Sequence, residues 1–166
     1  FIFTNSVSNK VFKSPIKQNQ IVKIINVTKA GTLNSLLTNS EKKTVTNLTV
    51  TGNLDARDFK NMRDSMPVLS VLDMSAVTID AYSGSEGTNS DYTTFLPNEI
   101  PETAFYAYDS YPDIKKSALT SIVLPRSLTS IGDMAFIFCN SLTSISISAS
   151  ITQIGHIAFV GCSAAI

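Results

Sequence analysis

The chain has 166 residues, a hydrophobic content of 43% and 13 acidic against 13 basic residues, so its formal net charge is zero. This balance gives no general attraction to nucleic acid or to an anionic membrane. The absence of any run of 18 apolar residues excludes a membrane-spanning helix in this sequence.

The first 44 residues precede the repeated part of the chain. Residues 1–19 carry little pattern, and we interpret them as an extended arm or linker. Residues 21–27 predict a strand, and apolar spacing from Gly31 predicts a short helix that reaches Lys43. A strand and a helix before the first repeat would cover its open apolar end. We therefore interpret residues 20–44 as an N-terminal cap.

Four later segments alternate apolar and small polar residues, which predicts half-buried strands. These are residues 46–51, 70–75, 120–124 and 143–148. Between the first two, residues 55–66 predict a short amphipathic helix that ends before Pro67. Asp55 is its expected N-cap, and Asp58 suits its first turn.

Residues 119–141 and 142–164 are two copies of one repeat, identical at 11 of 23 positions. A fixed period of this length is typical of a solenoid, in which neighbouring units bury a shared apolar face. Earlier strands follow the same spacing, so about four coils are expected over residues 45–166. The expected apolar column is Leu48, Leu72, Ile122 and Ile145. Phe136 and Phe159 recur at the repeat period and are predicted to stack inside it.

The positions that define the repeat are mostly apolar, with a Gly-containing turn and one cysteine. In the first copy they are Leu119, Ile122, Leu124, Pro125, Ser127, Leu128, Thr129, Ile131, Gly132, Ala135, Phe136 and Cys139. This pattern resembles the BspA-type leucine-rich repeats of bacterial surface proteins. The resemblance implies a right-handed α/β solenoid with a short parallel sheet, export to the cell surface, and adhesion or host-protein binding. It implies no catalytic residue, because the matched positions serve packing and turns.

The stretch from Leu69 to Leu119 is longer than one repeat, which predicts irregular inserts at residues 78–97 and 106–118. The segment from 64 to 114 contains nine acidic residues, no Lys or Arg, and all five tyrosines. Loops inserted into a repeat scaffold are common binding sites, and tyrosine offers a large contact area. The predicted ligand-binding residues are Tyr82, Tyr92, Tyr106, Tyr108, Asp109 and Tyr111. The alternative is that these tyrosines pack locally and the acidic residues offset the basic N-terminal region.

Cys139 and Cys162 occupy the same position in the two copies. We interpret them as buried thiols that act as small apolar side chains. A disulfide between stacked neighbours is the alternative, and it needs Cα atoms within about 7 Å. Two thiols and the single His156 are too few for a zinc site, and no calcium-loop spacing occurs. We expect no metal and no cofactor.

Common catalytic motifs are missing from the sequence, and His156 aligns with Asp133 at a variable, exposed position. We therefore expect that the protein is not an enzyme. The leading hypothesis is an exported, cell-surface binding or adhesion module for an extracellular protein or glycan, without nucleic-acid binding. The alternative is a structural stalk that holds another domain away from the cell.

The ends of the sequence support two further expectations. It begins at Phe1 rather than Met, which predicts a processed or engineered fragment. It ends at Ile166 without a polar capping unit, so either the array continues or its last coil is bare. Self-association through an exposed C-terminal coil is a further hypothesis.

Overall fold

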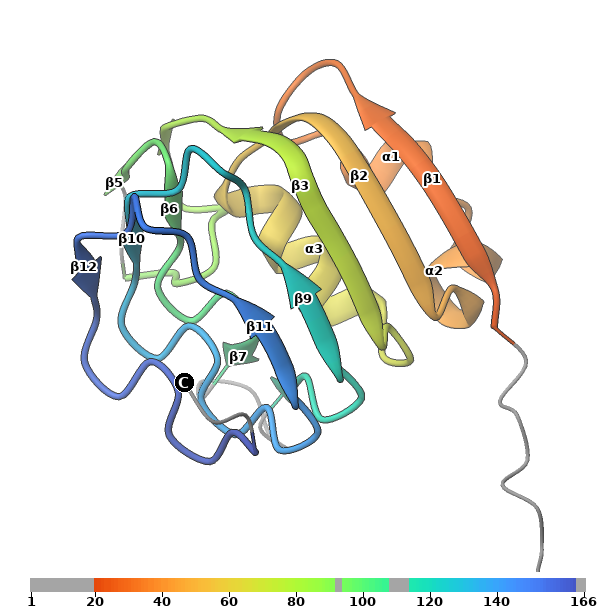
Figure 1. Ribbon diagram of the computed structural model, residues 1–166. Coiled ribbons are helices and arrows are strands. Elements are labelled where there is room, and N and C mark those ends of the chain that lie inside the picture. Colours follow the sequence, from red (N-terminus) through yellow and green to blue (C-terminus); the bar gives the residue numbers. More distant parts are fainter. Residues whose placement is uncertain (1–19, 92–93, 108–113, 164–166) are drawn as a thin grey trace, which may run out of the picture.

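A five-stranded parallel sheet forms one side of the computed structural model, which describes residues 20–91, 94–107 and 114–163 (Figure 1). Its strand order is β1-β2-β3-β9-β11. The strands are β1 (Val22–Val27), β2 (Asn47–Leu54), β3 (Val71–Ile79), β9 (Ser121–Val123) and β11 (Ser144–Ser146). All five strands expected from the sequence are therefore present, and the four that carry the repeat period are neighbours in one sheet.

The register of this sheet aligns equivalent side chains of successive repeats. Leu48 pairs with Leu72, Leu72 with Ile122, and Ile122 with Ile145. The first three are buried, and Ile145 packs against them while partly exposed. The predicted apolar column is confirmed. Along each strand, the residues before and after these apolar side chains face outward and form what we call the open sheet face. These residues are Asn47, Thr49, Val71, Asp73, Ser121, Val123, Ser144 and Ser146.

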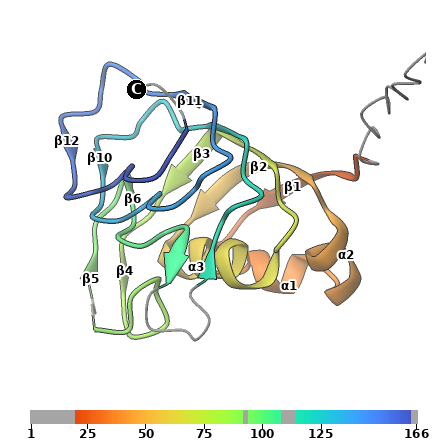
Figure 2. The ribbon, with the colours of Figure 1, turned by 90° about the horizontal axis from the view of Figure 1, so that it is seen from below.

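Three helices cover the opposite face of β1, β2 and β3, as the two views of the ribbon show (Figures 1 and 2). They are α1 (Leu33–Leu36), α2 (Asn39–Thr44) and α3 (Ala56–Ser65). Helix α3 begins at the predicted N-cap Asp55, which forms a capping box with Asp58. Its buried side chains include Phe59 and Met62, as the apolar spacing predicts.

The prediction of a single helix from Gly31 to Lys43 is wrong, because the segment forms two helices. Helix α1 stops where Leu37 adopts an extended conformation and buries its side chain. Thr38 then starts α2 with its own capping box, in which its side chain accepts from the Glu41 N–H and the Glu41 carboxylate accepts from the Thr38 N–H. The break places Leu37 in the core while Thr38 caps the second helix.

A smaller parallel sheet lies on another side of the core, at the left of Figure 2. It has the order β12-β10-β6, with β6 (Glu99–Ile100), β10 (Ser130–Ile131) and β12 (Gln153–Ile154). Each of the last two repeats thus contributes one strand to the large sheet and one to the small sheet. Between the sheets, aromatic rings form a column: Phe59 meets Phe105 edge-on at 6.1 Å, Phe105 stacks on Phe136 at 5.1 Å, and Phe136 stacks on Phe159 at 5.2 Å. The predicted stacking of Phe136 and Phe159 is confirmed.

Two short antiparallel pairs lie in the segments that the sequence marks as irregular. One joins β4 (Tyr82–Ser83) to β5 (Thr94–Phe95), and the other joins β7 (Tyr106–Ala107) to β8 (Ile114–Lys115). Strand β3 continues to Ile79, so the first irregular segment, placed at 78–97 from the sequence, begins inside this strand. The β4–β5 pair lies beside the small sheet, where it borders the groove described below (Figure 2).

Candidate functional site

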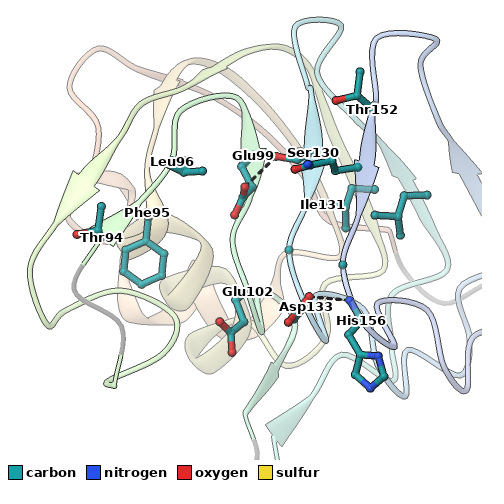
Figure 3. A pocket seen from close by; sticks show the side chains of 14 residues that line it. Thr94, Phe95, Leu96, Glu99, Glu102, Ser130, Ile131, Asp133, Thr152 and His156 are labelled. Atoms are coloured by element: carbon teal, nitrogen blue, oxygen red, sulfur yellow. Dashed lines mark hydrogen bonds between the residues drawn. The ribbon is translucent and has the colours of Figure 1, made fainter.

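An open groove of about 740 Å³ lies over the small sheet (Figure 3). Its floor contains two rows of side chains from equivalent positions of three stacked coils. The first row is Glu99, Ser130 and Gln153, which are in register on β6, β10 and β12. The second row is Glu102, Asp133 and His156, from the turns that follow these strands. Thr94, Phe95 and Leu96 form one wall, and we call the whole feature the carboxylate groove.

In the last two coils a glycine lies between the two rows, at Gly132 and Gly155. A Cβ atom on Gly132 would lie 2.5 Å from the backbone N of Glu102, and one on Gly155 would lie 2.4 Å from the backbone N of Asp133. Successive coils approach so closely here that only glycine fits. At these two positions no side chain projects between the rows. A larger residue at either position would force the coils of the groove floor apart.

Each carboxylate of the groove accepts a hydrogen bond from a neutral donor. Glu99 Oε2 accepts from Ser130 Oγ at 2.8 Å, and Asp133 Oδ1 accepts from the backbone N–H of His156 at 2.6 Å. Both bonds appear as dashed lines in Figure 3. Glu102 Oε1 accepts from Asn89 Nδ2 at 3.0 Å. These donors orient the carboxylates but do not neutralise their charge, and no Lys or Arg is among the described lining residues.

A buried arginine fixes the first insertion against the coils that form the groove. Arg63 of α3 is 5% exposed, and its Nη1 donates to the carbonyls of Thr88 at 2.6 Å, Thr103 at 3.0 Å and Tyr106 at 3.2 Å. Its Nε also pairs with Asp64 at 2.6 Å. A guanidinium can serve several acceptors at once because its donors point outward in one plane. The insertion is thus held by hydrogen bonds in the interior.

The segment that Arg63 holds is hydrogen-bonded to Glu102, a residue of the groove. Thr88 Oγ1 donates to the carbonyl of Glu102 at 2.6 Å, and the neighbouring Asn89 donates to the Glu102 side chain. Thr103 Oγ1 donates back to the Thr88 carbonyl at 3.1 Å. Thr88 and Asn89 are both buried. The insertion therefore positions one of the three carboxylates of the groove.

Comparison with protein families identifies the repeats that carry this floor. Residues 98–166 match the family model described as a BspA type leucine rich repeat region (6 copies). This segment is therefore similar to BspA-type leucine-rich repeats. A search of curated proteins gave no match. The resemblance stated from residues 119–164 is confirmed, and the repeat region reaches back to residue 98, which includes β6 and the whole groove floor.

The structure places two of the predicted ligand-binding tyrosines outside the groove. Tyr82 is half-buried between the guanidinium of Arg57, 4.5 Å from its ring centroid, and the ring of Phe95, 6.0 Å away. Tyr106 is buried and meets Phe138 edge-on at 5.8 Å. Tyr92, Tyr108, Asp109 and Tyr111 lie outside the described residues. The ligand role of the six residues stays a prediction.

The sequence contains a signal for the groove that the tyrosine-centred interpretation does not use. The turn Ile100-Pro101-Glu102 aligns with Ile131-Gly132-Asp133 and with Ile154-Gly155-His156. Stacking these turns places Glu102, Asp133 and His156 in one row, so the second row follows from the repeat alignment alone. The Arg63 contacts carry no such signal, because their carbonyl partners lie 25 to 43 residues away along the chain.

The described residues contain no group of three or more His, Cys, Asp or Glu side chains placed to hold a metal ion. In this part of the chain no helix has the length and apolar character needed to cross a bilayer. Cys139 and Cys162 are free thiols, the first buried and the second half-buried.

Proposed function

We propose that this chain is a non-catalytic binding module of an exported, surface-displayed leucine-rich-repeat protein, and that it takes an extracellular protein or glycan ligand in the carboxylate groove. The observation that carries the proposal is the groove itself. It crosses three stacked repeats and has one wall from an insertion that a buried arginine holds in place. Such a preformed surface lowers the entropic cost of ligand binding.

The rest of the proposed architecture follows the repeat pattern. The array is taken as a right-handed solenoid, because β–crossover–β connections between parallel strands are almost always right-handed. Residues 20–44 are taken as its N-terminal cap, since β1 pairs with β2 at the start of the large sheet. Export and surface display are supported by the family resemblance, which is to repeats of bacterial surface proteins.

The absence of catalysis is also part of this proposal. A general base needs a side chain oriented toward a reacting group. In the groove, Asp133 contacts the backbone N–H of His156 rather than its imidazole ring. The arrangement supports binding through oriented hydrogen-bond acceptors.

The test is a binding screen of the full chain against immobilised extracellular matrix proteins and a glycan array. Two tryptophan substitutions test which surface of the protein binds the ligand. Gln153→Trp fills the groove at an exposed position of β12, whereas Ser144→Trp places the same bulk on the open sheet face. We expect Gln153→Trp to abolish binding and Ser144→Trp to preserve it. Loss with Ser144→Trp alone would move the site to the large sheet and contradict the proposal.

The competing function is a structural stalk, which the regular stacking of coils favours. A stalk predicts no ligand for the wild-type chain in the same screen, so that result would support it. The predicted role of the second insertion is tested separately by a Tyr108→Ala, Tyr111→Ala double variant. Tyr106 is left unchanged, because it is buried and its loss would disturb the fold. Unchanged binding by the double variant would remove these two tyrosines from the site.

A further inference from the structure

We infer that the outer side of the last repeat coil docks a second copy of this chain, so that the protein forms a two-fold symmetric dimer. The contact surface consists of apolar residues of residues 142–163 whose equivalents one coil earlier are buried. We call it the terminal face, and its members are Ile145, Ile151, Ile154, Phe159, Val160 and Cys162. This inference goes beyond the proposed ligand binding and does not depend on it.

Side chains of the terminal face are exposed only because no coil lies on them. Ile131 is 1% exposed, whereas Ile154, its register partner in the last coil, is 50% exposed. In the same way Ile137 is 6% exposed and its repeat equivalent Val160 is 48% exposed. The earlier coil is covered by the last one, and the terminal face is the same apolar cross-section without a cover. A contiguous exposed apolar surface of this kind marks an interaction site.

The last coil also presents the backbone acceptors that link one coil to the next. The carbonyl of Thr120 accepts from the N–H of Thr143 at 3.0 Å and from its Oγ1 at 3.3 Å. The carbonyl of Thr129 accepts from the N–H and Oγ1 of Thr152 at 2.9 and 3.3 Å. Within the described part of the chain, no donor reaches the carbonyls of Thr143 and Thr152 themselves. Both carbonyls are therefore available to a further strand.

Strand edges flank the terminal face. Strand β11 is the last strand of the large sheet, and β12 is the last strand of the small sheet (Figure 1). An unpaired edge is a template for another strand, and proteins usually protect it with charged side chains. Here all 13 Lys and Arg residues and all 13 Asp and Glu residues of the chain precede residue 134. The last coil therefore has no charged side chain of these types to oppose edge-to-edge association.

The opposite edge of the large sheet differs in charge. Val22 and Ile24 of β1 are 61% and 72% exposed, so this edge also carries apolar side chains. However, β1 contains Lys23, and helix α2, which is salt-bridged to this strand, has Lys42 and Lys43 in its last turn. A second copy at this edge would bring like charges together, which is unfavourable. The uncharged terminal face is therefore the favoured contact.

A second copy fits the terminal face because this surface is complementary to itself. A two-fold axis at right angles to β11 sets this strand antiparallel to the β11 of the other copy, and two strands in this orientation can exchange backbone hydrogen bonds. The exposed side of Phe159 would then be covered by apolar side chains. Inside the chain, Phe159 covers Phe136 in the same way, with ring centroids 5.2 Å apart. The dimer contact thus continues the contact between coils.

The experiment is analytical ultracentrifugation of the full chain between about 5 and 200 µM, because self-association depends on protein concentration. The terminal variant carries Ile154→Lys and Val160→Lys, at half-exposed members of the terminal face. The matched control carries Val22→Lys and Ile24→Lys, which adds the same charge to the opposite edge of the large sheet. A third variant carries Ile154→Asp and Val160→Asp. Circular dichroism checks that each variant folds.

We expect a dimer of the wild-type chain that dissociates on dilution. The terminal variant should raise the dimer Kd at least about tenfold, and the control should change it less than about twofold. An equal mixture of the Lys and Asp variants should recover the dimer, because opposite charges then meet across the contact. A wild type that stays monomeric throughout, or a loss in the control as large as in the terminal variant, would overturn the inference.

The wild-type chain offers a second measurement that needs no substitution. Cys162 belongs to the terminal face and is half-buried, so a docked copy would cover its thiol. Its rate of modification by iodoacetamide should fall at least about threefold from dilute to concentrated protein. A rate of Cys162 modification that does not change in a sample that sediments as a dimer would place the contact elsewhere and overturn the inference. Open-ended association into larger species would contradict a two-fold contact.

Discussion

Leu72 and Ile122 are register partners on β3 and β9, although 50 residues separate them along the chain. The interposed segment includes two short antiparallel pairs and a strand of the small sheet. Strands β3 and β9 therefore pair in the register of the repeat although a long irregular segment connects them. This pairing keeps the apolar column continuous and places the first insertion beside the carboxylate groove.

Substitution of Leu72 tests the continuity of the column. Leu72→Ala would leave a cavity among Leu48, Ile122 and their neighbours, because Leu72 is completely buried. We expect the free energy of unfolding to fall by about 2–5 kcal/mol, measured by urea denaturation. The control Ser121→Ala, a half-buried position on the open sheet face, should change it by less than about 0.5 kcal/mol. Similar losses in the two variants would show that Leu72 is not part of a packed column.

Arg63 offers a test of how the first insertion is held. Arg63→Gln removes the donor that the buried carbonyls of Thr88 and Thr103 share. We expect a loss of about 2–4 kcal/mol in unfolding free energy. We also expect faster amide hydrogen exchange across residues 84–91, because this segment loses its contact with α3. Lys60→Gln, a half-buried position on the same helix, is the control. Unchanged exchange across the insertion would contradict the role assigned to Arg63.

Lys116 should make stability depend on pH in an unusual direction. Its ammonium group is buried at 2% exposure and donates to the Met66 carbonyl, and burial lowers its pKa to about 7. A lysine in the unfolded chain has a pKa of about 10.4. Between these values the unfolded chain binds more protons than the folded chain, so the free energy of unfolding rises with pH.

The size of this effect can be measured by urea denaturation from pH 7.0 to pH 9.5. Lys116 should add about 3 kcal/mol to the unfolding free energy over this range, with the penalty for burial fully present below pH 7. The variant Lys116→Met lacks the titrating group, so its stability should rise less over the same range. Parallel curves for the two proteins would show that the ammonium is not desolvated in the fold.

The two thiols should differ in reactivity although they occupy equivalent repeat positions. Cys139 is completely buried, and burial raises its pKa to about 12. Cys162 is half-buried, so reagents reach it more easily, although burial raises its pKa as well. Because the thiolate is the nucleophile, iodoacetamide at pH 8 should modify Cys162 at least about tenfold faster than Cys139. Mass spectrometry of peptides would measure both rates, and equal rates in the native protein would be the contrary result.

Much of the fold could be predicted because the chain repeats its apolar pattern. Strand alternation around Leu48, Leu72, Ile122 and Ile145 predicts both the strands and their mutual pairing, and the recurrence of Phe136 and Phe159 predicts their stacking. Alternation cannot reveal the small sheet, because its strands have two residues each. The division of the helix after Leu36 depends on a local capping box that competes with helical spacing.

The site was harder to predict than the fold for a physical reason. A segment rich in tyrosine and acidic residues indicates a binding surface. Whether a tyrosine ring is exposed or packs inward, however, depends on long-range contacts such as that between Arg57 and Tyr82. The burial of Arg63 is of the same kind, because its carbonyl partners come from segments far away in the chain. The row of Glu102, Asp133 and His156 is different. It follows from aligning three turns of the repeat.

The most direct measurement is amide hydrogen exchange of the full chain with and without a ligand found in the binding screen. We expect slower exchange in the ligand's presence at residues 99–102, 130–133 and 152–156, which belong to the three coils of the groove floor. Exchange at residues 47–51 and 71–75, on the open sheet face, should not change. Protection of the open sheet face with no change in the groove segments would contradict a ligand site over the small sheet.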